Sequence, residues 1–278
     1  MIRIISDSST LYTKAEAAAL GIDIEMLTVT VNGKTYREQE EIKTEEFIDI
    51  IHQGYVPSSS QPAVGEVLDV YNKYPQDEVL NITIADGLSG TYQTACGAAS
   101  MAQNPERITV FNSRTLCYPQ RVLVLRALDL AKKGFDVHAI IAELEKLLHT
   151  AKSYLIPRDF DYLRRGGRLS PLRANIGKLI KLAPVMTPTE DGRQLTRLSL
   201  QRSFKRAVQA VANDMKSFGV DAGYQIAISH AMAGDLLGTA SQIIGKAFPG
   251  INIQTFTLTP AISVQGGPGC VAIQAIKA

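Results

Sequence analysis

The chain has 278 residues, a hydrophobic content of 45% and a formal net charge of +2 from 29 basic and 27 acidic residues. This length exceeds the usual size of one hydrophobic core, so we expect two domains. The nearly balanced charge argues against a general polyanion binder, and nucleic acid is not an expected partner. The hydrophobic content is ordinary for a globular protein and identifies no ligand by itself.

Targeting and metal signals are weak throughout. The apolar run at the N-terminus is too short for a signal peptide, and no later stretch approaches the roughly 18 apolar residues of a membrane span. The cysteines are far apart and form neither a CxxC pair nor a disulfide framework, and the four histidines lack metal-ligand spacing. We therefore expect a cytoplasmic protein with reduced cysteines, no metal, no cofactor and no stable membrane insertion, which leaves transient membrane contact open.

Residues 1–150 are predicted to form an α/β domain with a mostly parallel sheet flanked by helices, because strand-like and helix-like segments alternate there. The predicted strands are Ile2 to Ser6, Asp23 to Val31, Val79 to Ala85 and Ile108 to Asn112. The predicted helices are Thr44 to Gly54, Thr91 to Gln103 and Gln120 to Lys133. An Asn32-Gly33 pair between strand-like residues indicates a hairpin.

Residues 151–278 are predicted to form a second α/β domain with a mixed or antiparallel sheet. Asp191-Gly192 marks a turn between two strand-like segments, which indicates an antiparallel hairpin of residues 185–187 and 195–198. The remaining predicted elements are helices Phe204 to Phe218 and Gly234 to Ala247, and strands Gln225 to Ser229, Ile251 to Leu258 and Cys270 to Ala275. A cleft between two such domains is the expected place for a small-molecule site.

Two short polar segments carry the chemistry, Ser58-Ser59-Ser60-Gln61-Pro62 and Leu88-Ser89-Gly90-Thr91-Tyr92-Gln93. We place each at the start of a helix, where backbone N–H groups lack intrahelical partners and the helix dipole is positive. Small hydroxyl residues and a glycine at such a place form a receptor for an anion, and two of them could hold one carboxylate or phosphate. Ordinary helix caps and turns are the alternative interpretation.

Three further segments complete the pattern: Asp7-Ser8-Ser9 after the first strand, Tyr162 to Arg168 in the middle, and Gly266-Gly267-Pro268-Gly269 near the end. In this order and spacing the chain resembles the DegV family, whose members are similar to bacterial fatty-acid-binding proteins of the FakB type. The resemblance extends from Ile5 to Gly269.

The resemblance implies that hydroxyl groups of the two polar segments hydrogen-bond the carboxylate of a fatty acid. The matching hydroxyls are those of Ser59, which stands at the position of a threonine, and of Ser89. Ser60, Gly90 and Thr91 belong to the same expected site, and the glycine lets the backbone approach the ligand closely.

The same resemblance implies an arginine near the head group, for which Arg202 fits, and a histidine before the last Gly-Pro-Gly turn. This chain departs from the family at the second position, where it has Gln265. Glutamine can donate an amide N–H but cannot become cationic near neutral pH. The departure therefore affects the expected phosphoryl transfer more than the expected lipid binding.

An arginine-rich segment supplies the expected surface for a protein partner. The resemblance implies that Arg164, Arg165 and Arg168 form a basic rim beside the mouth of the pocket, and Lys178 and Lys181 could extend it. The alternative is a solvated turn whose glycines adopt positive φ angles.

The predicted function is a carrier that holds a long-chain fatty acid in an apolar tunnel and presents its carboxylate to a separate fatty acid kinase subunit, without catalysis of its own. A hydrolase or phosphotransferase that uses Ser89 at the inter-domain cleft is the first alternative, although no motif places a base and neither GxSxG nor Walker A occurs. A regulatory protein that senses lipid is the second alternative.

Overall fold

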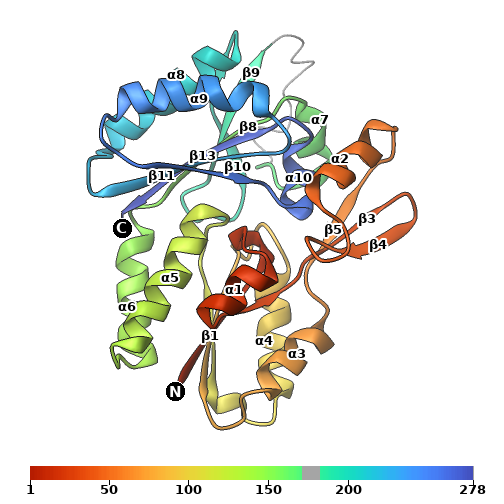
Figure 1. The fold of residues 1–278 in the computed structure, drawn as a ribbon, viewed down its shortest axis with the longest axis vertical. Coiled ribbons are helices and arrows are strands. Elements are labelled where there is room, and N and C mark those ends of the chain that lie inside the picture. The colour runs from red at the N-terminus through yellow and green to blue at the C-terminus, as the bar shows by residue number, and fades with distance from the viewer. Residues whose placement is uncertain (171–181, 278) are drawn as a thin grey trace.

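The computed structural model describes residues 1–170 and 182–277. Its strands form three sheets, and Figure 1 shows the N-terminal sheet with its helices below the C-terminal sheet. None of the helices in the described part of the chain combines the length and the apolar character needed to cross a membrane.

The N-terminal sheet is fully parallel and has the order β2-β1-β6-β7. Its strands are β1 (Ile2–Asp7), β2 (Asp23–Glu25), β6 (Glu78–Thr83) and β7 (Ile108–Asn112). Side chains alternate across the sheet, so Ile4 and Leu80 pack on one face and Ile5 and Val79 on the other. The first face is covered by α1 (Lys14–Leu20), α5 (Tyr118–Lys132) and α6 (Val137–Leu148), and the second by α3 (Val64–Asn72) and α4 (Thr91–Met101). The predicted parallel α/β arrangement is confirmed.

The C-terminal sheet is mixed and has the order β10-β9-β8-β13-β11-β12, in which only β11 and β12 are parallel neighbours. Its strands are β8 (Lys152–Ile156), β9 (Ala183–Pro188), β10 (Leu195–Gln201), β11 (Tyr224–His230), β12 (Ile253–Thr257) and β13 (Val271–Lys277). One face is covered by α8 (Phe204–Phe218) and α9 (Gly234–Ala247). The predicted mixed sheet, its hairpin and both helices are confirmed.

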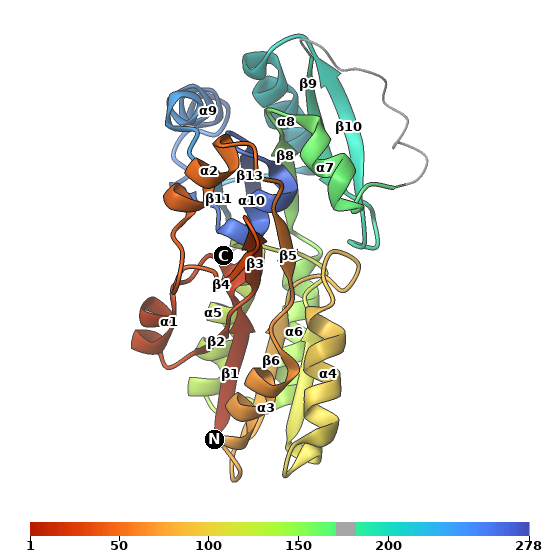
Figure 2. The ribbon, with the colours of Figure 1, turned by 90° about the vertical axis from the view of Figure 1, so that its right-hand side faces the viewer.

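A small antiparallel sheet of order β4-β3-β5, formed by residues 28–60, packs against a helix from the C-terminal part of the chain. Its elements, with the helix that packs on it, are β3 (Thr28–Val31), β4 (Lys34–Arg37), β5 (Ser58–Ser60) and α2 (Thr44–His52). The buried side chains of Val29 and Phe47 share a core with Ala261 and Val264 of α10 (Pro260–Gly266). Figure 2 shows β3, β5 and α10 together at the centre of the molecule, so residues near both ends of the sequence build this region.

The predicted strand from Asp23 to Val31 is wrong, because the segment divides into β2 and β3, which belong to different sheets. The chain leaves the first sheet at Leu27, whose amide donates to the hydroxyl of Ser8 at 2.9 Å. The Ser8 hydroxyl takes the place of a backbone acceptor in the neighbouring strand, so the pairing of β2 with β1 ends there. The predicted turn at Asn32 and Gly33 is confirmed, and both residues have positive φ, as a tight hairpin turn requires.

The predicted helix start at Ser58 to Pro62 is also wrong. Residues Ser58–Ser60 form β5, which pairs antiparallel with β3, and α3 begins only at Val64. Serine readily joins a strand where a neighbouring edge offers hydrogen bonds, and Pro62 then ends the pairing because it has no N–H. The helix has Ala63 at its N-cap, without a side-chain hydrogen bond.

Several elements were not predicted, although the apolar residues of α3 and α6 recur at helical spacing. These elements are α1, α3, α6, β5, β8, α7 (Phe160–Gly166), α10 and the short 3-10 helices Ser8–Thr10 and Pro105–Arg107. Of these, α7 changes the interpretation of the arginine-rich segment, which is a helix ending in a left-handed Gly167 rather than a turn.

Two buried carboxyl groups hold distant segments together. Glu38 accepts hydrogen bonds from the hydroxyl of Ser8 at 2.5 Å and from the amide of Ala261 at 2.7 Å, so it caps the N-terminus of α10. Glu25 accepts from the amide side chain of Asn81 at 2.8 Å. Burial raises the pKa of Glu38 to about 7 and that of Glu25 to about 8.

These shifts predict that the protein loses stability as the pH rises. Folded Glu25 keeps its proton up to about pH 8, whereas the unfolded chain releases it near 4.5, so the free energy of unfolding falls between these values. We expect Glu25→Gln to have a shallower slope and to be more stable than the parent at pH 8 by on the order of 1 kcal/mol or more. Urea unfolding at a series of pH values measures this. Glu78→Gln, at an exposed position of the same sheet, is the control, and an unchanged slope in Glu25→Gln would contradict the prediction.

Candidate ligand-binding site

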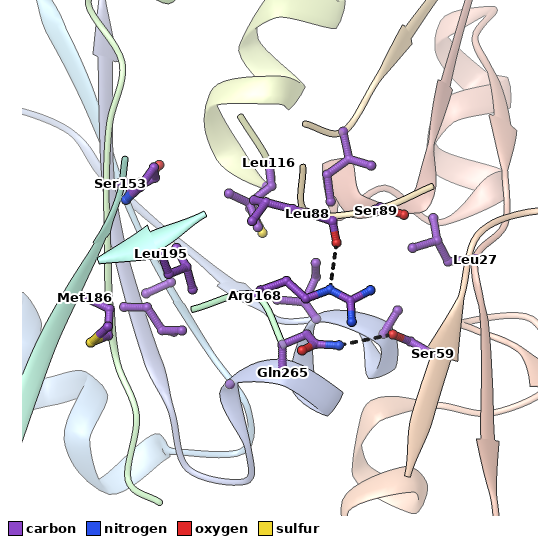
Figure 3. Close-up of a pocket in the computed structure, with 18 of the residues that line it drawn as sticks. Leu27, Ser59, Leu88, Ser89, Leu116, Ser153, Arg168, Met186, Leu195 and Gln265 are labelled. Carbon is purple, nitrogen blue, oxygen red and sulfur yellow. Dashed lines mark hydrogen bonds between the residues drawn. The ribbon is translucent and has the colours of Figure 1, made fainter. Parts of the chain in front are cut away.

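A cavity of about 910 Å³, including its open mouth, lies where the three sheets meet. Polar side chains occupy one end, and apolar side chains continue from there across the face of the C-terminal sheet (Figure 3). The lining residues are Leu27, Ser59, Ser60, Gln61, Ile84, Leu88, Ser89, Leu116, Cys117, Ser153, Tyr154, Leu155, Arg168, Met186, Pro188, Leu195, Ala261, Ile262, Gln265, Gly266, Ala272 and Gln274.

Ser59 and Gln265 face each other at the polar end, brought together by β5 and α10. The amide nitrogen of Gln265 lies 3.5 Å from the hydroxyl oxygen of Ser59, and its buried amide oxygen has no hydrogen-bond partner among residues 1–170 and 182–277. A Cβ on Gly166 would lie 1.8 Å from that oxygen, so only glycine fits at the end of α7. The amide oxygen can only accept a hydrogen bond, so the amide nitrogen is the group of Gln265 that can donate to a carboxylate.

Ser89 and Thr91 stand at the start of α4. The two hydroxyl oxygens lie 2.8 Å apart, and the Thr91 amide donates to the Ser89 hydroxyl at 3.3 Å. Gly90 is the N-cap residue, and the first turn of this helix contains no acidic residue. The positive end of the helix dipole therefore meets the cavity without a neutralising side chain, which favours an anion beside Ser89.

Arg168 supplies the positive charge of the site. Its Nε atom donates to the carbonyl oxygen of Leu88 at 3.1 Å, and a terminal nitrogen donates to that of Gly166 at 2.5 Å. Figure 3 shows the side chain between Ser59 and Gln265 on one side and Leu88 and Ser89 on the other. A guanidinium held in this way has donors left for a carboxylate.

The structure brings most of the predicted ligand-binding residues together. Ser59, Ser60, Ser89 and Gln265 line the cavity, and Gly90 and Thr91 adjoin it through the helix start described above.

Arg202 is the exception. It is exposed and follows the last residue of β10, whereas Leu195 at the first residue of that strand lines the cavity. At about 3.3 Å per residue the strand carries Arg202 roughly 20 Å away from Leu195. Among the described residues that line the cavity, Arg168 takes the place expected for an arginine.

The other two arginines of the expected rim lie on the outer surface of α7. Arg164 forms an ion pair with Asp161 at 3.1 Å, and the guanidinium of Arg165 lies 4.6 Å from the ring centre of Tyr162. A second hollow of about 440 Å³ adjoins the mouth and is lined by Arg165 and Arg168 among others. Lys178 and Lys181, which were expected to extend this surface, lie outside the described residues.

The apolar part of the site was not predicted from the sequence. Leu155 of β8 is flanked in the sheet by Met186 of β9 and Ala272 of β13, and all three line the cavity. Period-two alternation within β8 and β13 places such residues on one face, but it does not say which face carries a ligand.

Metal chemistry and nucleophilic chemistry find little support at this site. In residues 1–170 and 182–277 no group of three or more His, Cys, Asp or Glu side chains is placed to hold a metal ion. The hydrogen-bond partners of the Ser89 hydroxyl in the described chain belong to Thr91, which is not a base.

Known proteins resemble this chain over its whole length. The model of the family described as "Uncharacterised protein, DegV family" matches residues 1–278. A DegV domain-containing protein of Listeria monocytogenes is 32% identical, covering 98% of this chain and 97% of its own length. One from Staphylococcus aureus is 28% identical, covering 99% and 98%.

Solved structures of the family have the same fold. A DegV family protein from Thermus thermophilus, described by its fatty acid binding, superposes with a TM-score of 0.90 at 26% identity and covers 100% of this chain and 99% of its own. DegV of Bacillus subtilis, described as a fatty acid binding protein, gives 0.87 at 26% identity with the same coverage. The family-wide match and these superpositions agree with the order of motifs in the sequence, and the chain belongs to the DegV family.

Proposed function

We propose that this protein binds one long-chain fatty acid, with the carboxylate among Ser59, Ser89, Arg168 and Gln265 and the acyl chain over the apolar face of the C-terminal sheet. The observation that supports this most is the division of one cavity into a polar, positively charged end and an apolar remainder. Such a division matches an amphipathic ligand with an anionic head.

The two parts of the site have different energetic roles. Burial of the acyl chain contributes about 0.8 kcal/mol per CH2 group, so a chain of roughly 16 carbons offers on the order of 12 kcal/mol before any cost is subtracted. The polar end adds less and fixes which end of the ligand meets the mouth. The fatty-acid binding in the descriptions of the Thermus and Bacillus relatives supports the same ligand class here.

We also propose that the bound carboxylate is presented to a separate kinase subunit in the cytoplasm, which forms the acyl phosphate. Arg165 lines the hollow beside the mouth, and Arg164 is exposed on the same helix, so the two provide a basic surface for an acidic partner. Because the Ser89 hydroxyl meets Thr91 rather than a base, a carrier role accounts for the site better than a hydrolase does.

Mass spectrometry of an organic extract of the purified protein tests the ligand. A fatty acid in about one-to-one ratio with the protein is the expected result. A protein that stays empty after incubation with fatty acids would contradict the proposal, and esterase turnover abolished by Ser89→Ala would favour the hydrolase.

Gln265 leads to a prediction about the kinase step. Its amide can hold the head group but cannot carry the charge that develops during phosphoryl transfer. We expect Gln265→His to raise the rate of acyl-phosphate formation by a kinase subunit more than it raises the affinity for the acid. Rates and dissociation constants are compared for the two proteins with the same kinase subunit, with Gln265→Asn as a control that shortens the amide without adding charge. Equal rates for Gln265→His and the parent would mean that this position is not critical here.

A further inference from the structure

The cavity shares two lining residues with a separate surface groove, which is not the hollow beside Arg165. An open groove of about 1030 Å³ lies on the far side of the lining residues Ser153 and Pro188, and both cavities are lined by these two residues. The other residues of the groove include Lys152, Thr187 and Phe218. Ser153 and Pro188 therefore form the wall that separates the fatty-acid cavity from the outer groove at this place.

The backbone pairing of β8 and β9 is sparse at this wall. In the described chain the β8–β9 ladder consists of the antiparallel pair Leu155 and Met186. Two residues further along each strand, the same register sets Ser153 opposite Pro188. Proline has no N–H and cannot donate to the ladder, and the carbonyl of Ser153 accepts instead from the hydroxyl of Thr187 at 3.0 Å. A side-chain hydrogen bond thus joins the two strands where a backbone hydrogen bond would otherwise form. We call this place, between Ser153 of β8 and Pro188 of β9, the seam.

A single small side chain fills the seam from the cavity side. The Ser153 hydroxyl accepts from the side-chain amide of Gln274 at 2.8 Å, and this amide also donates to the carbonyl of Leu116 at 3.1 Å. The Gln274 oxygen accepts from the amide of Tyr118 at 3.1 Å, so its side chain is held on both ends. Because these hydrogen bonds fix the Gln274 side chain, the width of the seam depends on the size of the side chain at position 153.

We propose that the seam at Ser153 and Pro188 is a distal outlet of the cavity, through which the methyl end of a long acyl chain reaches the outer groove. Ser89 and Arg168, which we propose to hold the head group, lie away from Ser153 in the cavity (Figure 3). The small side chain at position 153 therefore lets the protein hold acyl chains that are longer than the cavity. This inference rests on the proposed function, because it assigns the chain-length range of the same site.

Binding of a homologous series of saturated acids tests the outlet. Dissociation constants for laurate, palmitate and behenate are measured for the parent and for Ser153→Leu, which fills the seam. Glu190→Leu is the matched control, because this exposed residue lines the outer groove away from the cavity. Ser153→Val serves as a smaller plug, and thermal melting of every variant shows whether it folds.

We expect the parent to bind behenate about as well as palmitate. In Ser153→Leu, behenate should bind at least about tenfold more weakly while laurate changes by less than about twofold. Glu190→Leu should keep the parental profile. An equal loss for all three acids, or no loss for behenate in both folded plug variants, would overturn the outlet. Failure of the parent to bind any of the acids would instead refute the proposed function.

A second measurement locates the methyl end directly. Behenate carrying a nitroxide at its terminal carbon is bound to the parent, and its relaxation by a water-soluble nickel complex is followed by electron spin resonance. We expect the nitroxide of behenate to be accessible and that of a terminally labelled laurate to be protected. Protection of both labels would place the whole chain inside a closed cavity and overturn the proposal.

Discussion

Replacing Arg168 with methionine is expected to weaken fatty-acid binding by about 2 kcal/mol, roughly thirtyfold in dissociation constant. The guanidinium is the positive group among the described lining residues, and it is half-buried between Ser89 and Gln265. Methionine keeps much of the packing volume and removes the charge, so the loss reports the interaction with the carboxylate. Titration with a fluorescent fatty acid measures the change.

Matched variants separate charge from position. Arg168→Lys keeps the charge but cannot reproduce both hydrogen bonds, to Leu88 and to Gly166, so we expect an intermediate affinity. Arg165→Met, on the exposed side of the same segment, should leave the affinity unchanged. If Arg168→Met binds the fatty acid with wild-type affinity and has an unaltered melting temperature, Arg168 does not bind the carboxylate and contributes only to the surface for the partner.

The second large effect concerns the two serines. Ser89→Ala and Ser59→Ala should each cost roughly 1.5–3 kcal/mol of binding free energy, because each removes one donor to a charged group in a partly dehydrated site. Thr91 fixes the orientation of the Ser89 hydroxyl, and Gln265 approaches that of Ser59, so both donors are already positioned in the free protein.

The control for these variants lies in β5, next to Ser59. Ser58→Ala changes a neighbouring hydroxyl that does not line the cavity, and it should bind the fatty acid as the parent does. A fatty alcohol of equal length should bind more weakly than the acid to the parent, and this difference should shrink in both serine variants. Wild-type affinity of both alanine variants would show that the head group lies elsewhere.

Helices and strands with strong internal signals could be predicted from the residues alone. The ranges of α8 and α9 follow from apolar periodicity, and the hairpins follow from Asn32-Gly33 and Asp191-Gly192. These signals act over a few residues, so neighbours in the chain are sufficient to create them.

The polar end of the site could be predicted from motifs, although not its arrangement. The order of motifs identified Ser59, Ser89 and Gln265, which line one cavity. Arg168 was assigned to the outer rim and Arg202 to the head group, because the direction of an arginine side chain depends on the element that carries it. In the structure Arg168 lies just beyond the end of α7 and lines the cavity, whereas β10 carries Arg202 away from it.

The sequence by itself determined the class of fold and the residue types available for an anionic head group, because both depend on local patterns and side-chain chemistry. Tertiary structure decided which residues meet. Glu38 caps a helix 223 positions away, and Gln265 reaches Ser59 across 206 positions. The division of residues 23–31 between two sheets and the seam at Ser153 have the same origin. Each is set by hydrogen bonds to distant segments, which outweigh weak local propensities once the chain has packed.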